Sequence, residues 1–280
     1  MTESSDSPAF PHLFIDFTTT SDLAEDQRWS TYADVERLCR GPEPVPGWVV
    51  TERAAVDTEL GILKTGKEAD VFLMDRSVPD GKSSLLAAKR YRATDHRLFH
   101  RSADYTATRR MRNTRDARAI AKKTSFGRQV AAGQWAMAEW ESLKRLWSAG
   151  VPVPYPVQID GTEILMEFIG DPDSGVGAPR LAETRPGPAE LREWFDQVRD
   201  AMVALASAGL AHGDLSPYNI LTLNGRVVMI DLPQVVDIVA NPLGAEFLHR
   251  DCRNVCDWFV RRGLRVDSND LFTDLVALAY

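Results

Sequence analysis

The sequence predicts an α+β chain in two lobes: a small lobe with an antiparallel sheet and one main helix, and a second lobe that is mostly helical. Three short runs with period-two alternation stand early in the chain, at 57–63, 69–74 and 84–91. Apolar side chains recur with helical spacing over 188–208, and Gly209 follows as a helix stop. Strands that come first and helices that come later favour the α+β class.

The two lobes are expected at 48–170 and 171–280, after an N-terminal extension over 1–47. The boundary between the lobes is predicted by a loop dense in Pro and Gly that begins at Asp171. The extension is expected to be partly disordered, because its first 28 residues are rich in Ser, Thr and Asp and show little periodicity. It should also contain a short helix over 30–39.

The composition is that of an ordinary globular chain, with 280 residues, 44% hydrophobic residues, 26% charged residues and a net charge of −7. No apolar run is as long as a membrane span, and the first seven residues are polar. The cysteines Cys39, Cys252 and Cys256 are too few for a disulfide framework, and we expect them in the core rather than at a zinc site. These features predict a cytoplasmic protein with no membrane contact.

The stretch from His212 to Gln234 carries the strongest functional pattern. Asp214 and Asn219 lie five positions apart, and the Asn224-Gly225 pair predicts a type I′ hairpin that returns Asp231 to the side of Asn219. An amide oxygen and a carboxylate are hard ligands that suit Mg²⁺. The spacing is typical of a protein-kinase catalytic loop, in which the first Asp accepts a hydroxyl proton and the other two residues hold metal. A polar turn before a hairpin with a capping Asp is the alternative.

A lysine and a glutamate are expected on inward faces of the small lobe. Lys89 shares the apolar face of the run 84–91, and Glu139 lies on the apolar stripe of a helix predicted over 132–147. Each charge is costly to bury alone, so we expect the two to pair, as the strand lysine and helix glutamate do in kinases. The alternative is that both side chains extend to solvent.

Two further segments are candidates for nucleotide binding. The connection between the first two strands is short and polar and contains a glycine, so its N–H groups could approach phosphates, although an ordinary hairpin turn explains it as well. Its candidate residues are Lys64, Thr65, Gly66, Lys67, Glu68, Ala69 and Val71. In the run 163–170, Met166 would lie behind a purine base and backbone groups at Glu167 and Ile169 would face its edge, whereas a simple edge strand is the alternative.

The segment 97–128 is unusually basic for a chain of negative net charge. Its cationic residues include Arg101, Arg109, Arg110, Arg112, Arg115, Arg118, Lys122 and Lys123. It is either a solvated loop or a contact for RNA or a phosphorylated partner.

Several stretches together resemble the RIO family of atypical protein kinases, most closely its RIO1-type branch. They are His-Gly-Asp-Leu-Ser-Pro-Tyr-Asn-Ile-Leu at 212–221, Ile-Asp-Leu-Pro-Gln at 230–234, Thr-Gly-Lys-Glu-Ala-Asp-Val-Phe at 65–72, Ala-Lys-Arg-Tyr-Arg at 88–92, the stretch 141–154 and Glu-Phe-Leu-His-Arg-Asp-Cys-Arg-Asn at 246–254. The sequence departs from the family pattern at Pro217, where many relatives have Glu. The resemblance implies a two-lobed kinase fold, binding of ATP with Mg²⁺ or Mn²⁺, and autophosphorylation. It also implies that Asp231 accepts phosphate as an aspartyl-phosphate, so that members act as ATPase switches.

The leading hypothesis is a non-specific serine/threonine protein kinase that phosphorylates a protein or itself. Asp214 would act as the base, Lys89 held by Glu139 would bind the α- and β-phosphates, and Asn219 and Asp231 would hold the metal. One alternative is a small-molecule phosphotransferase of the aminoglycoside type, whose catalytic loop starts in a similar way. The other is a non-catalytic RNA-binding or ribosome-assembly factor that uses ATP as a conformational ligand.

Overall fold

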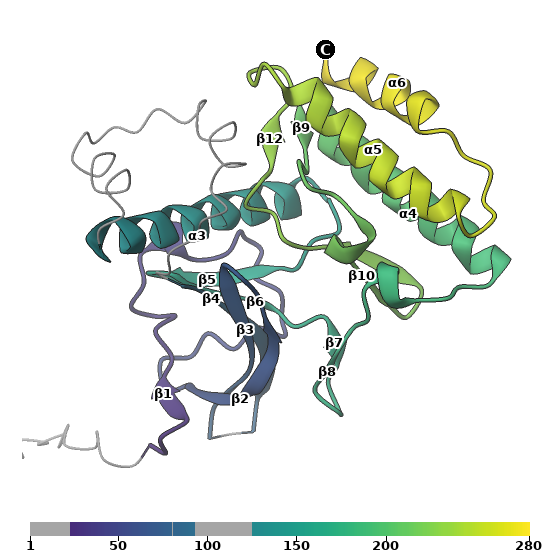
Figure 1. Ribbon diagram of the computed structural model, residues 1–280. Helices are drawn as coiled ribbons and strands as arrows, with labels where there is room; N and C mark the ends of the chain where they lie inside the picture. The colour runs from purple at the N-terminus through teal and green to yellow at the C-terminus, as the bar shows by residue number, and fades with distance from the viewer. Residues whose placement is uncertain (1–22, 80, 93–124) are drawn as a thin grey trace, which may run out of the picture.

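The computed structural model describes residues 23–79, 81–92 and 125–280, which form a sheet lobe and a helical lobe (Figure 1). The sheet lobe contains six strands in the order β1-β2-β3-β4-β6-β5, and each pair of neighbours is antiparallel. The strands are β1 (Gln27–Trp29), β2 (Val56–Thr65), β3 (Ala69–Ser77), β4 (Ser83–Tyr91), β5 (Pro156–Asp160) and β6 (Glu163–Glu167). The three predicted strands are therefore confirmed as β2, β3 and β4, and each is longer than the sequence pattern indicated.

The main helix of the sheet lobe is α3 (Ser125–Ser148), which lies along the sheet (Figure 1). It begins before the predicted start near 132. Its inward side is apolar, with Ala136, Trp140 and Leu146 completely buried. Gly150, with φ of 76°, ends this segment, and the chain then enters β5.

The helical lobe is built on α4 (Pro188–Ser207), α5 (Gly244–Val260) and α6 (Ser268–Ala279), which lie side by side (Figure 1). Local signals set their ends. Pro188 occupies the first turn of α4, Gly209 follows that helix with φ of 72°, and the Asp267 carboxylate caps α6 by accepting from the amides of Asn269 and Asp270.

Short elements complete the chain. They are the pairs β7 (Gly170–Asp171) with β8 (Val176–Gly177), β9 (Leu210–Ala211) with β12 (Val236–Asp237) and β10 (Ile220–Leu223) with β11 (Arg226–Met229), and the 3₁₀ turns η1 (Arg37–Cys39), η2 (Leu181–Glu183) and η3 (Pro217–Asn219).

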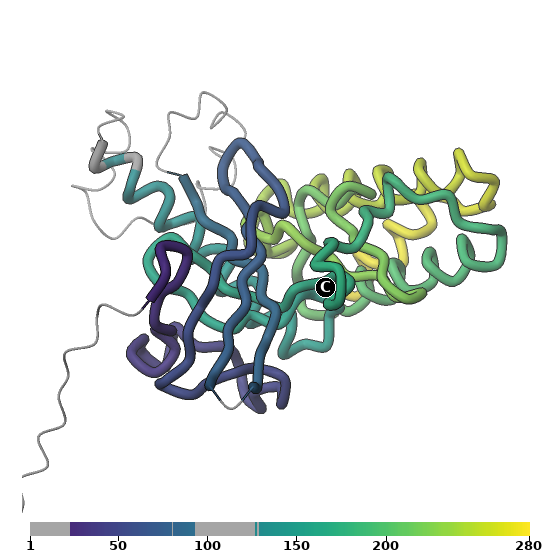
Figure 2. Tube along the Cα trace, turned by 90° about the horizontal axis from the view of Figure 1, so that it is seen from below, coloured from purple at the N-terminus to yellow at the C-terminus, as the bar shows by residue number. Residues whose placement is uncertain are grey.

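One cluster of buried apolar residues joins the two lobes. It runs from Ala87 on β4 through Trp140 on α3 to Phe195 on α4 and Phe259 on α5. Figure 2 shows the two lobes adjacent, with the chain passing from one to the other after β6. We propose that the boundary between the lobes lies at 170/171, although the apolar core continues across it.

The N-terminal extension differs from the prediction. Residues 27–29 are not a loose tail, because they pair with β2 as the edge strand β1. The short helix predicted over 30–39 is wrong: the chain makes one turn after Thr31 and then only the 3₁₀ turn η1. The Arg40 guanidinium donates to the carbonyls of Ala33 and Val35, which a longer helix would have used, and Arg40 itself is held by a bridge to Gln158 of the distant strand β5. Residues 1–22, where disorder was also expected, lie outside the described part.

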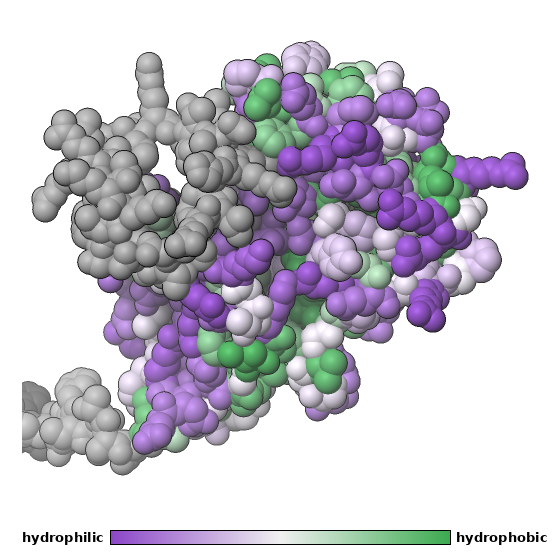
Figure 3. All heavy atoms as spheres, in the orientation of Figure 1, coloured by the Kyte–Doolittle hydropathy of each residue, from purple (hydrophilic) through white to green (hydrophobic). Residues whose placement is uncertain are grey.

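The surface in Figure 3 is mostly hydrophilic, with apolar side chains gathered at the lower edge of the sheet lobe and at the tip of β7–β8. Exposed apolar residues of these elements are Leu60, Ile62 and Val176. Within the described residues, no helix has the length and apolarity that crossing a membrane requires. Most of the basic segment 97–128 lies outside the described residues.

Candidate active site

The hairpin β10–β11 brings the two predicted metal ligands to the same end. Asn224 and Gly225 have φ values of 50° and 77°, as a type I′ turn requires, and the register pairs Ile220 with Met229. One residue further, the Ile230 amide donates to the Asn219 carbonyl at 2.9 Å. Asp231 therefore follows directly after a residue that is bonded to Asn219.

The loop that carries Asp214 is tied to Asn219. The Asn219 side-chain amide donates to the backbone carbonyl of Asp214 at 2.9 Å, and Asn219 is only 9% exposed. This bond uses the NH₂ end of the side chain and so sets which way its carbonyl oxygen points. The Asp214 side chain is partly exposed, as a group that must meet a substrate has to be.

Lys89 lies between two carboxylates that come from different lobes. Its Nζ is 2.7 Å from Glu139 Oε1 on α3 and 3.0 Å from Asp231 Oδ1 in the helical lobe. Glu139 is 2% exposed and also accepts from the Tyr91 hydroxyl and from the Leu232 amide. The predicted pairing of Lys89 and Glu139 is present in the structure, and the contact of Lys89 with Asp231 joins this pair to the helical lobe.

The charges of this cluster stabilise each other. Burial alone would lower the pKa of Lys89, but the carboxylates of Asp231 and Glu139 outweigh it and raise that pKa well above its usual value. In turn, the Lys89 ammonium lowers the pKa of Asp231. Burial, and then the nearby Glu139 carboxylate, raise the pKa of the Tyr91 hydroxyl well above its usual value, so it remains a donor. The cluster is thus charged as Lys⁺ with Asp231⁻ near neutral pH.

Asp231 has an unusual backbone. Its φ of 66° is in the left-handed region that a non-glycine residue rarely adopts, and its side chain is 48% exposed. Strain of this kind is often found where a side chain must be aimed at a ligand. The carboxylate of Asp231 and the amide oxygen of Asn219 are hard donors, and they fit Mg²⁺ that completes its shell with phosphate oxygens and water.

Three residues of α5 support the loop that carries Asp214, and the sequence interpretation did not assign them to the site. The Asp251 carboxylate accepts from the amides of Gly213 and Leu215, both at 2.8 Å, while Arg250 donates to the Gly213 carbonyl and Asn254 donates to the Leu215 carbonyl at 3.0 Å. Burial raises the pKa of Asp251 to about 7. The signal was available in the sequence, because Asp251 is a charged residue on the apolar face of its helix, as Glu139 is.

His212, at the start of the motif, is a buried packing residue of the loop. Its Nε2 lies 3.1 Å from the Ile230 carbonyl, and burial lowers the pKa of its ring. It therefore joins the loop to β11 as a neutral side chain and does not face the cleft as a charge.

The predicted phosphate loop is a tight turn between β2 and β3. The Gly66 amide donates to the Ala69 carbonyl at 3.0 Å, and a Cβ at Gly66 would lie 2.8 Å from that carbonyl oxygen, so only glycine fits. Lys64 pairs with Val71, and Val71 pairs with Lys89 in the next strand. Directly opposed residues of antiparallel strands share a face, so these three side chains lie on one face of the sheet.

The other residues of that loop differ in their exposure. Thr65, Lys67 and Glu68 are exposed at the turn, and Ala69 is buried beneath it. Burial, and then the nearby charge of Arg180, lower the pKa of Lys64. Arg180 pairs with Leu221 of β10 in an isolated bridge, so it is a cation of the helical lobe whose charge acts on Lys64. The sequence interpretation did not include it.

The segment after β6 is only partly as predicted. Met166 is buried and pairs with Ala87, which places it on the same face as Lys89. However, two of the backbone groups expected to face a base are used within the fold. The Glu167 amide donates to the Tyr155 carbonyl, and the Ile169 carbonyl accepts from the Ala178 amide.

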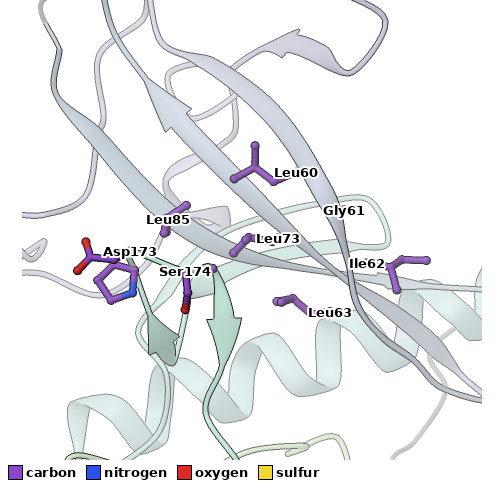
Figure 4. A pocket seen from close by; sticks show the side chains of 10 residues that line it. Leu60, Gly61, Ile62, Leu63, Leu73, Leu85, Asp173 and Ser174 are labelled. Carbon is purple, nitrogen blue, oxygen red and sulfur yellow. The ribbon is translucent and has the colours of Figure 1, made fainter.

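A hollow of about 390 Å³ lies at the outer rim of this sheet face (Figure 4). Leu63, Leu73 and Leu85 line it from the strands, and the turn 172–175 between β7 and β8 lines it at one side. Its lining does not include Lys89, Asp214 or Asp231, so the hollow is not the centre of the candidate chemistry.

Known proteins resemble this chain over most of its length. The family model described as the RIO domain matches residues 80–271. The RIO-type serine/threonine-protein kinase Rio1 of Haloferax volcanii is 34% identical over 217 residues, which are 78% of this chain and 68% of that protein. Serine/threonine-protein kinase RIO1 of Chaetomium thermophilum is 33% identical and covers 73% of this chain, which spans 40% of that longer relative.

Among solved structures, the Rio2 kinase-ADP/Mg²⁺-phosphoaspartate complex from Chaetomium thermophilum matches with a TM-score of 0.54 at 19% identity, over 79% of this chain and 62% of that chain. This similarity shows that the two chains share a fold.

Proposed function

The chain belongs to the RIO family of atypical serine/threonine protein kinases, and on that premise we propose that it transfers the γ-phosphoryl group of ATP to a protein hydroxyl or to its own Asp231. The observation that carries the proposal is the position of Lys89, which bonds Glu139 of the sheet lobe and Asp231 of the helical lobe at once. The two lobes thereby meet at the place where a kinase binds the phosphates of ATP.

The nucleotide would lie against the sheet face that carries Lys64, Val71 and Lys89. Lys89 would hold the α- and β-phosphates, the turn 65–69 would cover them, and Met166 would back the base. The Glu167 carbonyl and the Ile169 amide would contact the edge of the base, because the other two backbone groups of these residues are used within the fold.

For transfer to a protein, Asp214 would accept the proton of the acceptor hydroxyl. The hydroxyl oxygen then forms a bond to the γ-phosphorus while the bond from that phosphorus to the β–γ bridging oxygen breaks, and ADP leaves. Asn219 and Asp231 would hold Mg²⁺, which neutralises charge on the phosphates when bound. Asp251 and Asn254 hold the backbone of the Asp214 loop while this occurs.

For transfer to the enzyme, an oxygen of the Asp231 carboxylate would replace the acceptor hydroxyl. The same β–γ bond breaks, an acyl phosphate forms, and water later releases inorganic phosphate. The left-handed backbone and the 48% exposure of Asp231 support this second route, because they present the carboxylate to the cleft.

One variant and one analysis of the product test these roles. Asp214→Asn should bind ATP with nearly unchanged affinity and lose phosphoryl transfer to protein. Mass spectrometry after incubation with Mg-ATP should find phosphate on serine or threonine, on Asp231, or on both. Hydroxylamine cleaves an acyl phosphate and leaves a phosphoserine intact, so it separates the two products. Transfer to a protein hydroxyl by Asp214→Asn at the wild-type rate would show that the base is assigned wrongly.

The remaining partner assignments rest on the sequence. We retain the cytoplasm as the proposed compartment, which the three free cysteines support. Contact of the segment 97–128 with RNA is proposed from its charge alone. Binding to ribosomal RNA that weakens steeply with salt, and that weakens further when Arg109, Arg110 and Arg112 are neutralised, would support it.

A further inference from the structure

We propose that the segment 30–42, called here the N-terminal strap, positions Glu139 for the reaction by fixing helix α3 from outside the cleft. The proposal rests on the proposed function, because it concerns the Lys89–Glu139 pair. The strap lies outside the residues that match the RIO domain, which begin at 80.

The strap is fastened to the edge of the sheet at β5. Arg40 forms a bridge with Gln158, the Gly41 amide donates to the Val157 carbonyl at 3.0 Å, and the Gln158 side chain donates to the Thr31 hydroxyl at 2.8 Å. A Cβ at Gly41 would lie 1.9 Å from the Pro156 carbonyl oxygen, so the strap approaches the strand as closely as a backbone can.

The strap is also braced internally. The Arg40 guanidinium donates to the Ala33 carbonyl at 2.9 Å and to the Val35 carbonyl at 3.0 Å, and it lies over the ring of the buried Tyr32. The turn η1 is thereby held at a fixed place relative to β5, and its carbonyls point in fixed directions.

From that place, a single carbonyl reaches α3. The Leu38 carbonyl accepts from the Trp140 indole N–H and from the Lys144 ammonium, both at 3.1 Å. Trp140 is completely buried, and the Lys144 ammonium also lies 5.3 Å from the centre of its ring. Two donors one helical turn apart therefore meet one acceptor, which fixes both the height and the rotation of the helix.

Trp140 is the residue next to Glu139. Neighbouring residues of a helix point about 100° apart, so the same turn of α3 has one side chain bonded to the strap and the next bonded to Lys89 in the cleft. A helix that slid or turned by about 1 Å would lose one of these bonds, and errors of that size at reacting groups are costly. The strap thus connects the N-terminal extension to the candidate active site.

The test compares three variants of α3. Trp140→Phe keeps a smaller aromatic ring and removes the N–H donor, and Lys144→Met removes the second donor. Ser142→Ala is the control, because its hydroxyl donates only to Ala138 within the helix and is buried to a similar degree. We expect Trp140→Phe to lower kcat about fivefold in the folded fraction, as the loss of one positioning hydrogen bond would, and Ser142→Ala to leave it unchanged.

A double-mutant cycle separates positioning from stability. If Trp140 acts through Glu139, Glu139→Gln should cost clearly less in the Trp140→Phe background than in the wild type. The proposal would be overturned if the effects of Trp140→Phe and Glu139→Gln on kcat simply multiplied in the double variant. It would also be overturned if the variants changed only the melting temperature. Titration with a non-hydrolysable ATP analogue repeats the comparison without turnover, so the strap can be judged even if the wild type transfers no phosphate.

Discussion

The Glu139 carboxylate and the Lys89 ammonium meet at 2.7 Å, although they come from a helix and a strand that lie 50 positions apart in the chain. Burying either charge without the other would be energetically unfavourable. Glu139 is almost completely buried, and Lys89 remains charged because Glu139 and Asp231 outweigh the effect of burial on its pKa.

Replacing Glu139 by Gln should impair the reaction more than the fold. Lys89 would keep its bond to Asp231 and would be drawn toward it, away from the place where it holds phosphates. We expect kcat to fall by about 10- to 100-fold. Steady-state kinetics with a thermal melt will check this, and an unchanged kcat in a stable variant would contradict it.

Lys64 should contribute to binding in proportion to the negative charge of the ligand. It lies on the same face as Lys89. Burial lowers the pKa of Lys64, and the nearby charge of Arg180 in the other lobe lowers it further. An anion between the two cations relieves their repulsion. Lys64→Ser should therefore weaken binding of ATP more than binding of adenosine.

The control for that titration is Lys82→Ser, because Lys82 lies just before β4 at the other end of the sheet and pairs with Glu52. Equal losses for ATP and adenosine in Lys64→Ser would show that the residue acts by packing and not by charge.

The contribution of Asp251 to the stability of the chain should fall as the pH rises toward neutrality. Asp251 has a pKa of about 7 in the fold, compared with about 3.9 for an unfolded Asp. Between these values the folded state binds more protons than the unfolded state, so raising the pH through this window favours unfolding. Urea titrations from pH 4.5 to 7.5 should show the trend, and Asp251→Asn should reduce its slope. Parallel slopes for the two proteins would disprove the assignment.

The buried pair Arg76–Asp57 should be a large determinant of stability in the sheet lobe. Its two bonds measure 2.6 and 2.9 Å, and both side chains are at most 1% exposed. Asp57→Ala leaves a guanidinium in the core without its carboxylate, which should cost about 3–5 kcal/mol in the free energy of unfolding. Glu52→Gln, which breaks an exposed pair with Lys82, should cause no measurable change in the same denaturant titration.

Features determined by residues close together in the sequence could be predicted, and most features determined by distant residues could not. The hairpin at Asn224-Gly225 and the strands β2–β4 depend on turn chemistry and alternation within a few residues, and they were predicted from the sequence. Glu139 was found because a charge on an apolar stripe needs a partner. Asp251 has the same pattern on α5, but its partners are backbone amides far away in the chain. A pattern of side chains does not identify such partners.

The errors came from long-range contacts that override local preference. Residues 30–39 have the composition of a short helix, yet the Arg40 side chain and the edge of β5 take over the carbonyls and the path of the segment. The strand β1 is three residues long and exists because β2 offers it an edge. Arg180 was missed for the same reason, since its relation to Lys64 arises only when the two lobes come together.

The apolar cluster that links α3 to α4 and α5 has a thermodynamic consequence. Because the largest apolar core is shared by both lobes, unfolding one lobe would remove packing from the other, and a calorimeter should record a single heat-absorption peak whose van't Hoff and calorimetric enthalpies agree. Domains joined only by a tether would instead melt in two steps.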